Sequence, residues 1–216
     1  MHVGPNQKLF ISSSDLYLPV NIYVYEHGQI SLPDKTKLYN TRAQIEGQFG
    51  GVKEELILAY AELTFTDTAH TVQKDRGALE LTKITVMNEG VLNFLHEVDY
   101  HLKLDKLVIN TGGVVNARVL HLETGEVELQ EGSLIDLDGR GEVKDGPGYS
   151  GAVSGAGHGG QGGVGGSEEE GVERGETNDE FLNPVLMGSG GETTRGGGAL
   201  MVTAETVVMD GIIRAK

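Results

Sequence analysis

Apolar and polar residues alternate along most of the chain between Lys8 and Leu137. A period of two puts apolar side chains on one face of an extended strand and polar side chains on the other. The best helical candidate, residues 55–63, has no clear cap at either end. The pattern therefore predicts an all-β fold, with strands in segments 16–25, 28–33, 55–66, 77–87, 90–95, 102–109, 113–122, 125–130 and 132–139.

Three of these segments begin alike, as GVLNF, GVVNA and GSLID, with the glycines Gly90, Gly113 and Gly132. These glycines recur at intervals of roughly 20 residues, which is typical of one turn of a three-sided solenoid. We therefore predict a right-handed parallel β-helix. The alternative is an antiparallel β-sandwich, whose strands recur every roughly 8–12 residues.

Asn93 and Asn116 occupy equivalent places in two of these repeats. In stacked coils their side-chain amides would form a ladder like those of cross-β stacks. The other interpretation is that the spacing of the two asparagines is a coincidence.

Glycine is concentrated in one part of the chain, because residues 141–198 hold 20 of the 33 glycines. Beyond them, VVMDGIIRA (207–215) echoes LIDLDGRGE (134–142), as two neighbouring coils would. Repeat proteins place insertions on loops. We therefore predict β-helix coils over 1–140, a glycine-rich loop insertion with an acidic tip over 141–198, and final strands over 199–216. We also expect the parent protein to continue into a further module, because an uncapped last strand exposes backbone groups.

Charge and composition exclude several classes of protein. Lys and Arg total 17 against 32 Asp and Glu, a formal charge of -15. Nucleic acids and anionic membrane surfaces need clustered cations, so neither is an expected partner. No apolar run approaches the roughly 20 residues of a membrane span, so we expect no membrane insertion. The absence of cysteine excludes disulfides, thiolate metal sites and cysteine nucleophiles.

The glycine-rich segment contains two G-x-G-x-x-G patterns, GPGYSG (146–151) and GAGHGG (155–160). Dinucleotide binding requires a helix to begin at the last glycine. More glycine follows each pattern, and glycine is a poor helix former. The sequence therefore argues against a dinucleotide site.

Four short motifs occur in the order Asn110-Thr111-Gly112, Asp136 with Asp138, Gly157-His158-Gly159 and Arg214-Ala215-Lys216. This order resembles the pectin-lyase-like, galacturonan-cleaving glycoside hydrolases, which are themselves parallel β-helices. Their motifs are Asn-Thr-Asp, Asp-Asp, Gly-His-Gly and Arg-x-Lys. The resemblance implies inverting hydrolysis by paired carboxylates, with Asp136, Asp138, His158, Arg214 and Lys216 as the catalytic set. The first motif lacks its carboxylate here, and Leu137 separates the two aspartates.

Two groups of side chains could bind metal ions. His96 and His101 flank Glu97 and Asp99, which suits either a surface metal site or a solvated polar turn. Seven carboxylates lie in segment 167–180 without the spacing of a calcium loop. Such a run is usually a solvated tip. Weak binding of Ca²⁺ through Glu168, Glu169 and Glu170, or of a basic partner, is the other interpretation.

A second resemblance covers about residues 135–215. GAGHGGQGG, FLNPVLMGSGG and RGGGALMVTAETVVMDGIIRA are similar to glycine-rich β-helical modules of very large secreted or cell-surface proteins. The chain departs from them in its acidic insertion. The resemblance implies a structural or adhesive module with no catalytic residue. Glycine permits close approach of the backbone and positive φ, so the expected structural residues of the loop are Gly155, Gly157, His158, Gly159, Gly160, Gly188, Gly190, Gly191, Gly196, Gly197 and Gly198.

These observations favour a non-enzymatic building block of an extracellular or cell-surface assembly. Its expected partners are neighbouring modules, further copies of itself, or glycans. No cofactor is expected other than Ca²⁺ at the acidic tip. A carbohydrate-active or carbohydrate-binding β-helix is the alternative.

Overall fold

The computed structural model describes residues 1–13, 15–16, 21–46, 48–50, 54–65, 81–142, 148, 175–177, 179–180, 186–190 and 195–216. These residues form strands and turns and contain no helix, so the predicted all-β class is confirmed. Residues 55–63, the best helical candidate, form parts of two strands and the corner between them. The strands are His2–Val3 (β1), Lys8–Phe10 (β2), Asp15–Leu16 (β3), Asn21–Val24 (β4), Gln29–Ser31 (β5), Lys35–Tyr39 (β6), Arg42–Ile45 (β7), Gln48–Gly50 (β8), Glu55–Ala59 (β9), Glu62–Phe65 (β10), Leu81–Met87 (β11), Val91–Ile109 (β12), Val114–Leu129 (β13), Leu134–Asp136 (β14), Ala199–Met209 (β15) and Ile212–Arg214 (β16).

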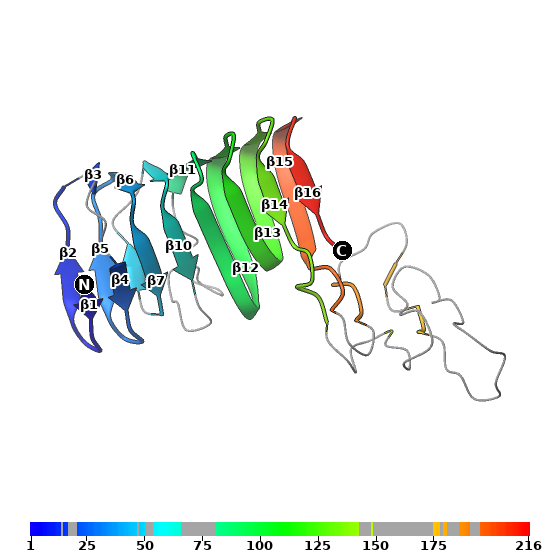
Figure 1. Cartoon of the computed structure of the whole chain (residues 1–216), viewed down its shortest axis with the longest axis horizontal. Helices are drawn as coiled ribbons and strands as arrows, with labels where there is room; N and C mark the ends of the chain where they lie inside the picture. The colour runs from blue at the N-terminus through cyan, green and yellow to red at the C-terminus, as the bar shows by residue number, and fades with distance from the viewer. Residues whose placement is uncertain are drawn as a thin grey trace. The chain divides into compact units, whose positions relative to one another are not determined.

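The early strands pair in three rows, because each strand joins the third strand after it. One row runs β1, β4, β7, β10, another β2, β5, β8, and a third β3, β6, β9. Figure 1 shows the first row side by side in chain order, from blue β1 to cyan β10. Paired residues lie about one predicted repeat apart, as Arg42 opposite Glu62 illustrates. The chain therefore returns to the same row after every three strands.

Two long strands join the first and third rows. The start of β12 pairs with β10, and its later part pairs with β11. β13 follows β12 along both parts, with a shift in register between Phe94 and Asp99. β14 and β15 then pair with β13, and β16 pairs with β14.

Every strand pair whose register is described is parallel. An antiparallel β-sandwich is therefore wrong for these residues, because its neighbouring strands would run in opposite directions. The parallel rows are compatible with a β-solenoid.

A tight turn recurs before strands of the stack. The N–H of Gly28, Gly90, Gly113 and Ser133 each donates to the carbonyl oxygen three residues earlier, over 2.8, 2.9, 2.8 and 3.0 Å. The residue before each of these has a positive φ, between 60° and 77°. Val91 pairs with Val114, and Val114 with Leu134, so Gly90 and Gly113 align with Ser133. The predicted equivalence of Gly132 with these two glycines is therefore wrong by one residue. Gly132 matches Gly112, and both supply the positive φ.

The corner at which Gly90 lies, between the third row and the first, also divides the predicted strand 55–66 into β9 and β10. Tyr60 lies between them with a φ of 51°, and the stacked positions Asn40 and Asn88 have φ of 52° and 50°. Asparagine adopts this left-handed conformation more easily than most residues. The two asparagines therefore suit this backbone conformation, whereas Tyr60 does not.

The interior of the stack follows from the alternation of apolar residues. Inward side chains of β9, β10, β12 and β13 are almost fully buried. Phe65 packs against Phe49 in the coil before and Phe94 in the coil after, at 5.6 and 5.8 Å between ring centroids, and Phe94 packs against Tyr100. Fully burying a side chain of this size stabilises the fold by about 1.5–3 kcal/mol. The aromatic column therefore links successive coils from inside.

The chain divides into two compact units. Unit 1 comprises Met1–Asp136 and Val202–Ile213, and unit 2 comprises Leu137–Met201 and Arg214–Lys216.

Candidate functional site

The predicted asparagine ladder is present on the wall of unit 1. Asn93 and Asn116 are paired in register, and the Asn116 amide donates to Asn93 Oδ1 over 2.7 Å. The Asn93 amide in turn donates to Glu62 and to Thr64, over 3.0 Å each. Asn93 is 4% exposed, so these bonds satisfy a side chain that would be costly to bury alone. The equivalence of the two asparagines is confirmed, and coincidence is excluded.

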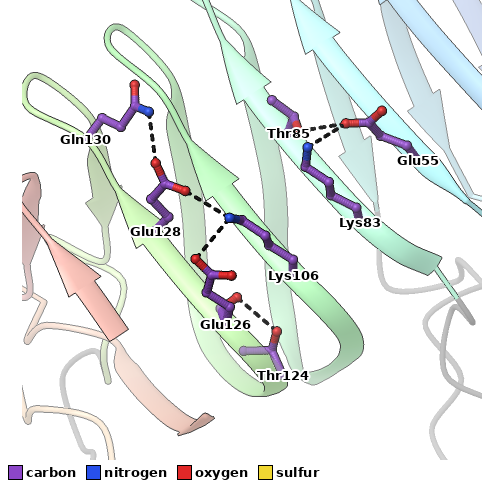
Figure 2. Close-up of polar contacts among 8 residues, drawn as sticks. All are labelled: Glu55, Lys83, Thr85, Lys106, Thr124, Glu126, Glu128 and Gln130. Carbon is purple, nitrogen blue, oxygen red and sulfur yellow. Dashed lines mark hydrogen bonds and ion pairs between the residues drawn. The ribbon is translucent and has the colours of Figure 1, made fainter. Parts of the chain in front are cut away.

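A column of charged residues runs along the third row of strands, which contains β6 and β9. Lys35, Glu55 and Lys83 are in register on β6, β9 and β11. Glu55 accepts from both lysines, with N–O distances of 3.0 Å. It also accepts from Thr85 over 3.2 Å (Figure 2). One carboxylate therefore connects three consecutive coils.

The column continues on β12 and β13. Lys106 lies opposite Glu126 and forms ion pairs with Glu126 at 2.9 Å and with Glu128 at 3.0 Å. Gln130 donates to Glu128 over 2.9 Å, so the polar chain extends to the end of β13 (Figure 2).

The contacts shift the pKa values of these groups. Burial tends to raise the pKa of Glu55, but hydrogen bonds and charges from Lys83 and Lys35 outweigh it and hold the pKa below its ordinary value. Hydrogen bonds from Gln130 and then Lys106 lower the pKa of Glu128. The bonds to Glu126 and Glu128 raise the pKa of Lys106, and the bond to Glu55 raises that of Lys35. All four shifts favour the charged forms. The column is therefore a structural network of ion pairs rather than an acid–base pair.

The sequence contained a signal for this column. Lys106 and Glu126 are one repeat apart in the chain, and so are Lys35 and Glu55. Opposite charges one coil apart become neighbours in a parallel stack. For Lys35 and Glu55 the signal was hidden because β6 was not among the predicted strands.

Unit 2 contains a lattice of close backbone contacts, formed by Gly141, Glu142, Gly188, Gly196 and Gly197. Gly141 donates to Gly196 over 2.7 Å, Glu142 to Gly188 over 3.0 Å, Gly188 to Gly197 over 2.9 Å and Gly196 to Glu142 over 3.2 Å. A Cβ added to Gly141, Gly196 or Gly197 would lie closer than 3.0 Å to backbone atoms. Only glycine fits at these three positions. We call this cluster the glycine lattice.

Asp138 anchors the end of unit 2. Its Oδ1 accepts from the backbone N–H of Lys216 over 2.8 Å, and its Oδ2 lies 3.4 Å from Nε of Arg214. Gly139 N–H also donates to the carbonyl oxygen of Lys216. Three of the alternative catalytic residues, Asp138, Arg214 and Lys216, are thus together. Asp136 lies on β14, in register with Asn116.

The other sequence candidates have different outcomes. Gly188, Gly196 and Gly197 belong to the glycine lattice, Gly198 donates to the carbonyl of Leu137 over 2.8 Å, and Gly190 is buried. His101 lies on β12. The side chains of His96, Glu97 and Asp99 lie outside the part that is described. So do Gly155, Gly157, His158, Gly159, Gly160, Glu168, Glu169, Glu170 and Gly191.

The last strands of unit 1 expose apolar side chains. We define the β15–β16 edge as Val202, Val207, Val208, Met209, Ile212 and Ile213, which are 37–56% exposed. Among the described strands, β15 pairs only with β13 and β16 only with β14. The edge therefore combines exposed apolar side chains with backbone that no described strand pairs on its outer side.

The described residues contain no group of three His, Asp or Glu side chains placed to hold a metal ion. Within the same residues there is no helix long and apolar enough to cross a membrane.

Comparison with known proteins gives no relative. No family model matches the chain, and neither does any curated protein or solved structure.

Proposed function

We propose that the chain is a right-handed parallel β-helix whose coils occupy residues 1–140. In this proposal residues 141–198 are a glycine-rich insertion and residues 199–216 complete the final strands. The parallel register of the rows supports it, and so does the echo between 134–142 and 207–215.

The proposed function is that of a non-enzymatic structural or adhesive building block in an extracellular or cell-surface assembly. Stacked coils make a stiff element, because each coil is held to the next by backbone ladders and by side-chain columns. The similarity of segment 135–215 to glycine-rich modules of large secreted proteins supports the location.

The β15–β16 edge is the observation that carries this proposal. An unpaired strand edge with exposed apolar side chains is a template for pairing with another chain. We propose that neighbouring modules or further copies of the protein join at this edge, strand to strand.

Sedimentation velocity over a range of concentrations tests this proposal. We expect the wild-type chain to form oligomers, and Val207→Lys and Met209→Lys each to abolish them, because a charge on an edge strand opposes pairing. Tyr23→Lys is the matched control, since Tyr23 is exposed on β4 in the wall of the stack. A monomeric wild type would contradict the proposal, as would oligomers that survive both edge substitutions.

A carbohydrate-active or carbohydrate-binding β-helix is the second candidate. The ion pair of Asp138 with Arg214 favours it, because such enzymes use carboxylates for hydrolysis and a cation suits an acidic sugar. Release of reducing ends from pectin that Asp136→Asn or His158→Ala abolishes would support this candidate. No release by the wild-type chain would contradict its enzymatic form.

A further inference from the structure

Two histidines stack on the wall of unit 1 and belong to neither the asparagine ladder nor the charged column. His101 on β12 and His121 on β13 are in register. Their ring centroids are 4.2 Å apart and their planes differ by 16°. His101 is exposed and His121 is half-buried, so the pair lies at the surface.

An ion pair lies next to the two histidines. Two residues further along the same strands, Lys103 and Glu123 form an ion pair with each other. The lysine charge is thereby compensated. A cation that approaches the two imidazoles meets no uncompensated lysine from this pair.

Imidazole nitrogen is a preferred ligand of Cu²⁺, Ni²⁺ and Zn²⁺, and a poor one for Ca²⁺ and Mg²⁺. Metal–nitrogen bonds are about 2.0–2.1 Å long. Two rings on neighbouring strands, already side by side, can direct one nitrogen each at a common ion by side-chain rotation.

We propose that His101 and His121 form a two-histidine site for a first-row transition-metal ion, with water completing the coordination. This inference is independent of the proposed building-block function. Among the described residues no group of three ligands includes the pair, so the proposed site has two protein ligands.

A metal at this place would tie one coil to the next. β12 and β13 belong to successive coils, and the two ligands are one repeat apart in the chain. An ion that binds the folded chain but not the unfolded chain stabilises the fold. The site therefore couples the ion to the stability of the stack.

Copper binding to the full chain tests the proposal, by calorimetric titration and by electron paramagnetic resonance of the bound Cu²⁺. We expect a one-to-one site with hyperfine coupling to two imidazole nitrogens. His101→Asn and His121→Asn should each weaken binding by about 100-fold, because loss of one ligand removes the chelate. The wall already accepts two adjacent asparagines, at Asn93 and Asn116, so the variants are expected to fold.

The double variant distinguishes a chelate from two independent ligands. In a chelate, either single substitution costs nearly as much as both together. His27→Asn is the control, because His27 is exposed and its positive φ suits asparagine. Additive losses, a single coupled nitrogen, or an unchanged affinity in both single variants would overturn the proposal. Copper should raise the melting temperature of the wild type and of the control but not of the three variants.

Discussion

Lys83 and Lys106 are neighbours in register, and each is paired with a carboxylate. Each lysine forms its ion pairs away from the shared boundary, Lys83 with Glu55 on one side and Lys106 with Glu126 on the other. In a parallel stack every wall residue has one neighbour in the coil before and one in the coil after. At the residue scale, the order of charges along the column decides whether such neighbours attract or repel.

Glu55→Gln should show how much the ion pairs of Glu55 contribute to the stability of the fold. The Glu55 side chain is 15% exposed and serves two lysines, so we expect a loss of about 1 kcal/mol in the free energy of unfolding at pH 7. Glu123→Gln is the matched control, because its pair with Lys103 is exposed on both sides and should matter less. Urea denaturation measures both. Equal losses in the two variants would contradict the account.

The comparison of wild type with Glu55→Gln also tests the pKa shift of Glu55. A carboxylate whose pKa is lowered on folding contributes stability above its ordinary pKa, 4.5 for Glu55, and loses that contribution as the pH falls through the lowered value. The difference between wild type and Glu55→Gln should therefore be full at pH 7 and shrink below about pH 4.5. A difference that grows in acid would contradict this sign.

Single residues show how far the sequence could predict the wall. Asn93 and Asn116 were found because the same residue recurs at the same place in two coils. Glu55 and Lys83 were not found, since the chain between them is longer than that between Lys35 and Glu55 and no fixed repeat aligns them. The register of the strands depends on the length of every loop. The alternation of apolar and polar residues does not reveal those lengths.

At the scale of elements, β6, β7 and β8 were missing from the predicted strands although they complete the three rows. Their inward residues include Thr36 and Ala43, which are buried but weakly apolar. Their outward residues include Lys35, Lys37 and Arg42. Periodicity methods need strong contrast between faces, so strands with small or polar inward residues escape them. The predicted breaks within β12 and β13 failed for a related reason, because His101 and Glu123, which lie in those breaks, are polar wall residues of continuous strands.

The glycine lattice makes a prediction of its own at this scale. A Cβ at Gly196 would press on the backbone of Gly188, whereas a Cβ at Gly188 would lie 3.0 Å from the nearest backbone nitrogen, that of Gly197. Gly196→Ala should therefore disrupt the lattice more than Gly188→Ala, since backbone cannot move as a flexible side chain can.

Hydrogen exchange of the backbone amides measures this effect. Gly196→Ala should remove the protection of the Gly141 and Gly188 amides, which donate within the lattice, and leave β12 protected. Gly188→Ala should reduce the same protection only in part. Unchanged exchange in both variants, or equal loss in both, would contradict the close approach on which the lattice depends.

For the whole molecule, the central claim is that strands one repeat apart in the chain lie parallel and in register, coil upon coil. The sequence predicted this because its apolar alternation and turns recur near that interval. It did not predict the hydrogen bond of Asp138 with the backbone of Lys216, because that contact joins segments far apart in the chain.

Disulfide trapping tests the central claim most directly, because the chain contains no cysteine of its own. On β12 and β13, His101 is opposite His121 and Lys103 is opposite Glu123. Double cysteine variants at these two pairs should form disulfides readily under mild oxidation, since cross-strand partners lie within the reach of a disulfide. The crossed pairs, His101→Cys with Glu123→Cys and Lys103→Cys with His121→Cys, should form them poorly. Efficient bonding of the crossed pairs with none in the direct pairs would show antiparallel strands, and the parallel stack would be wrong.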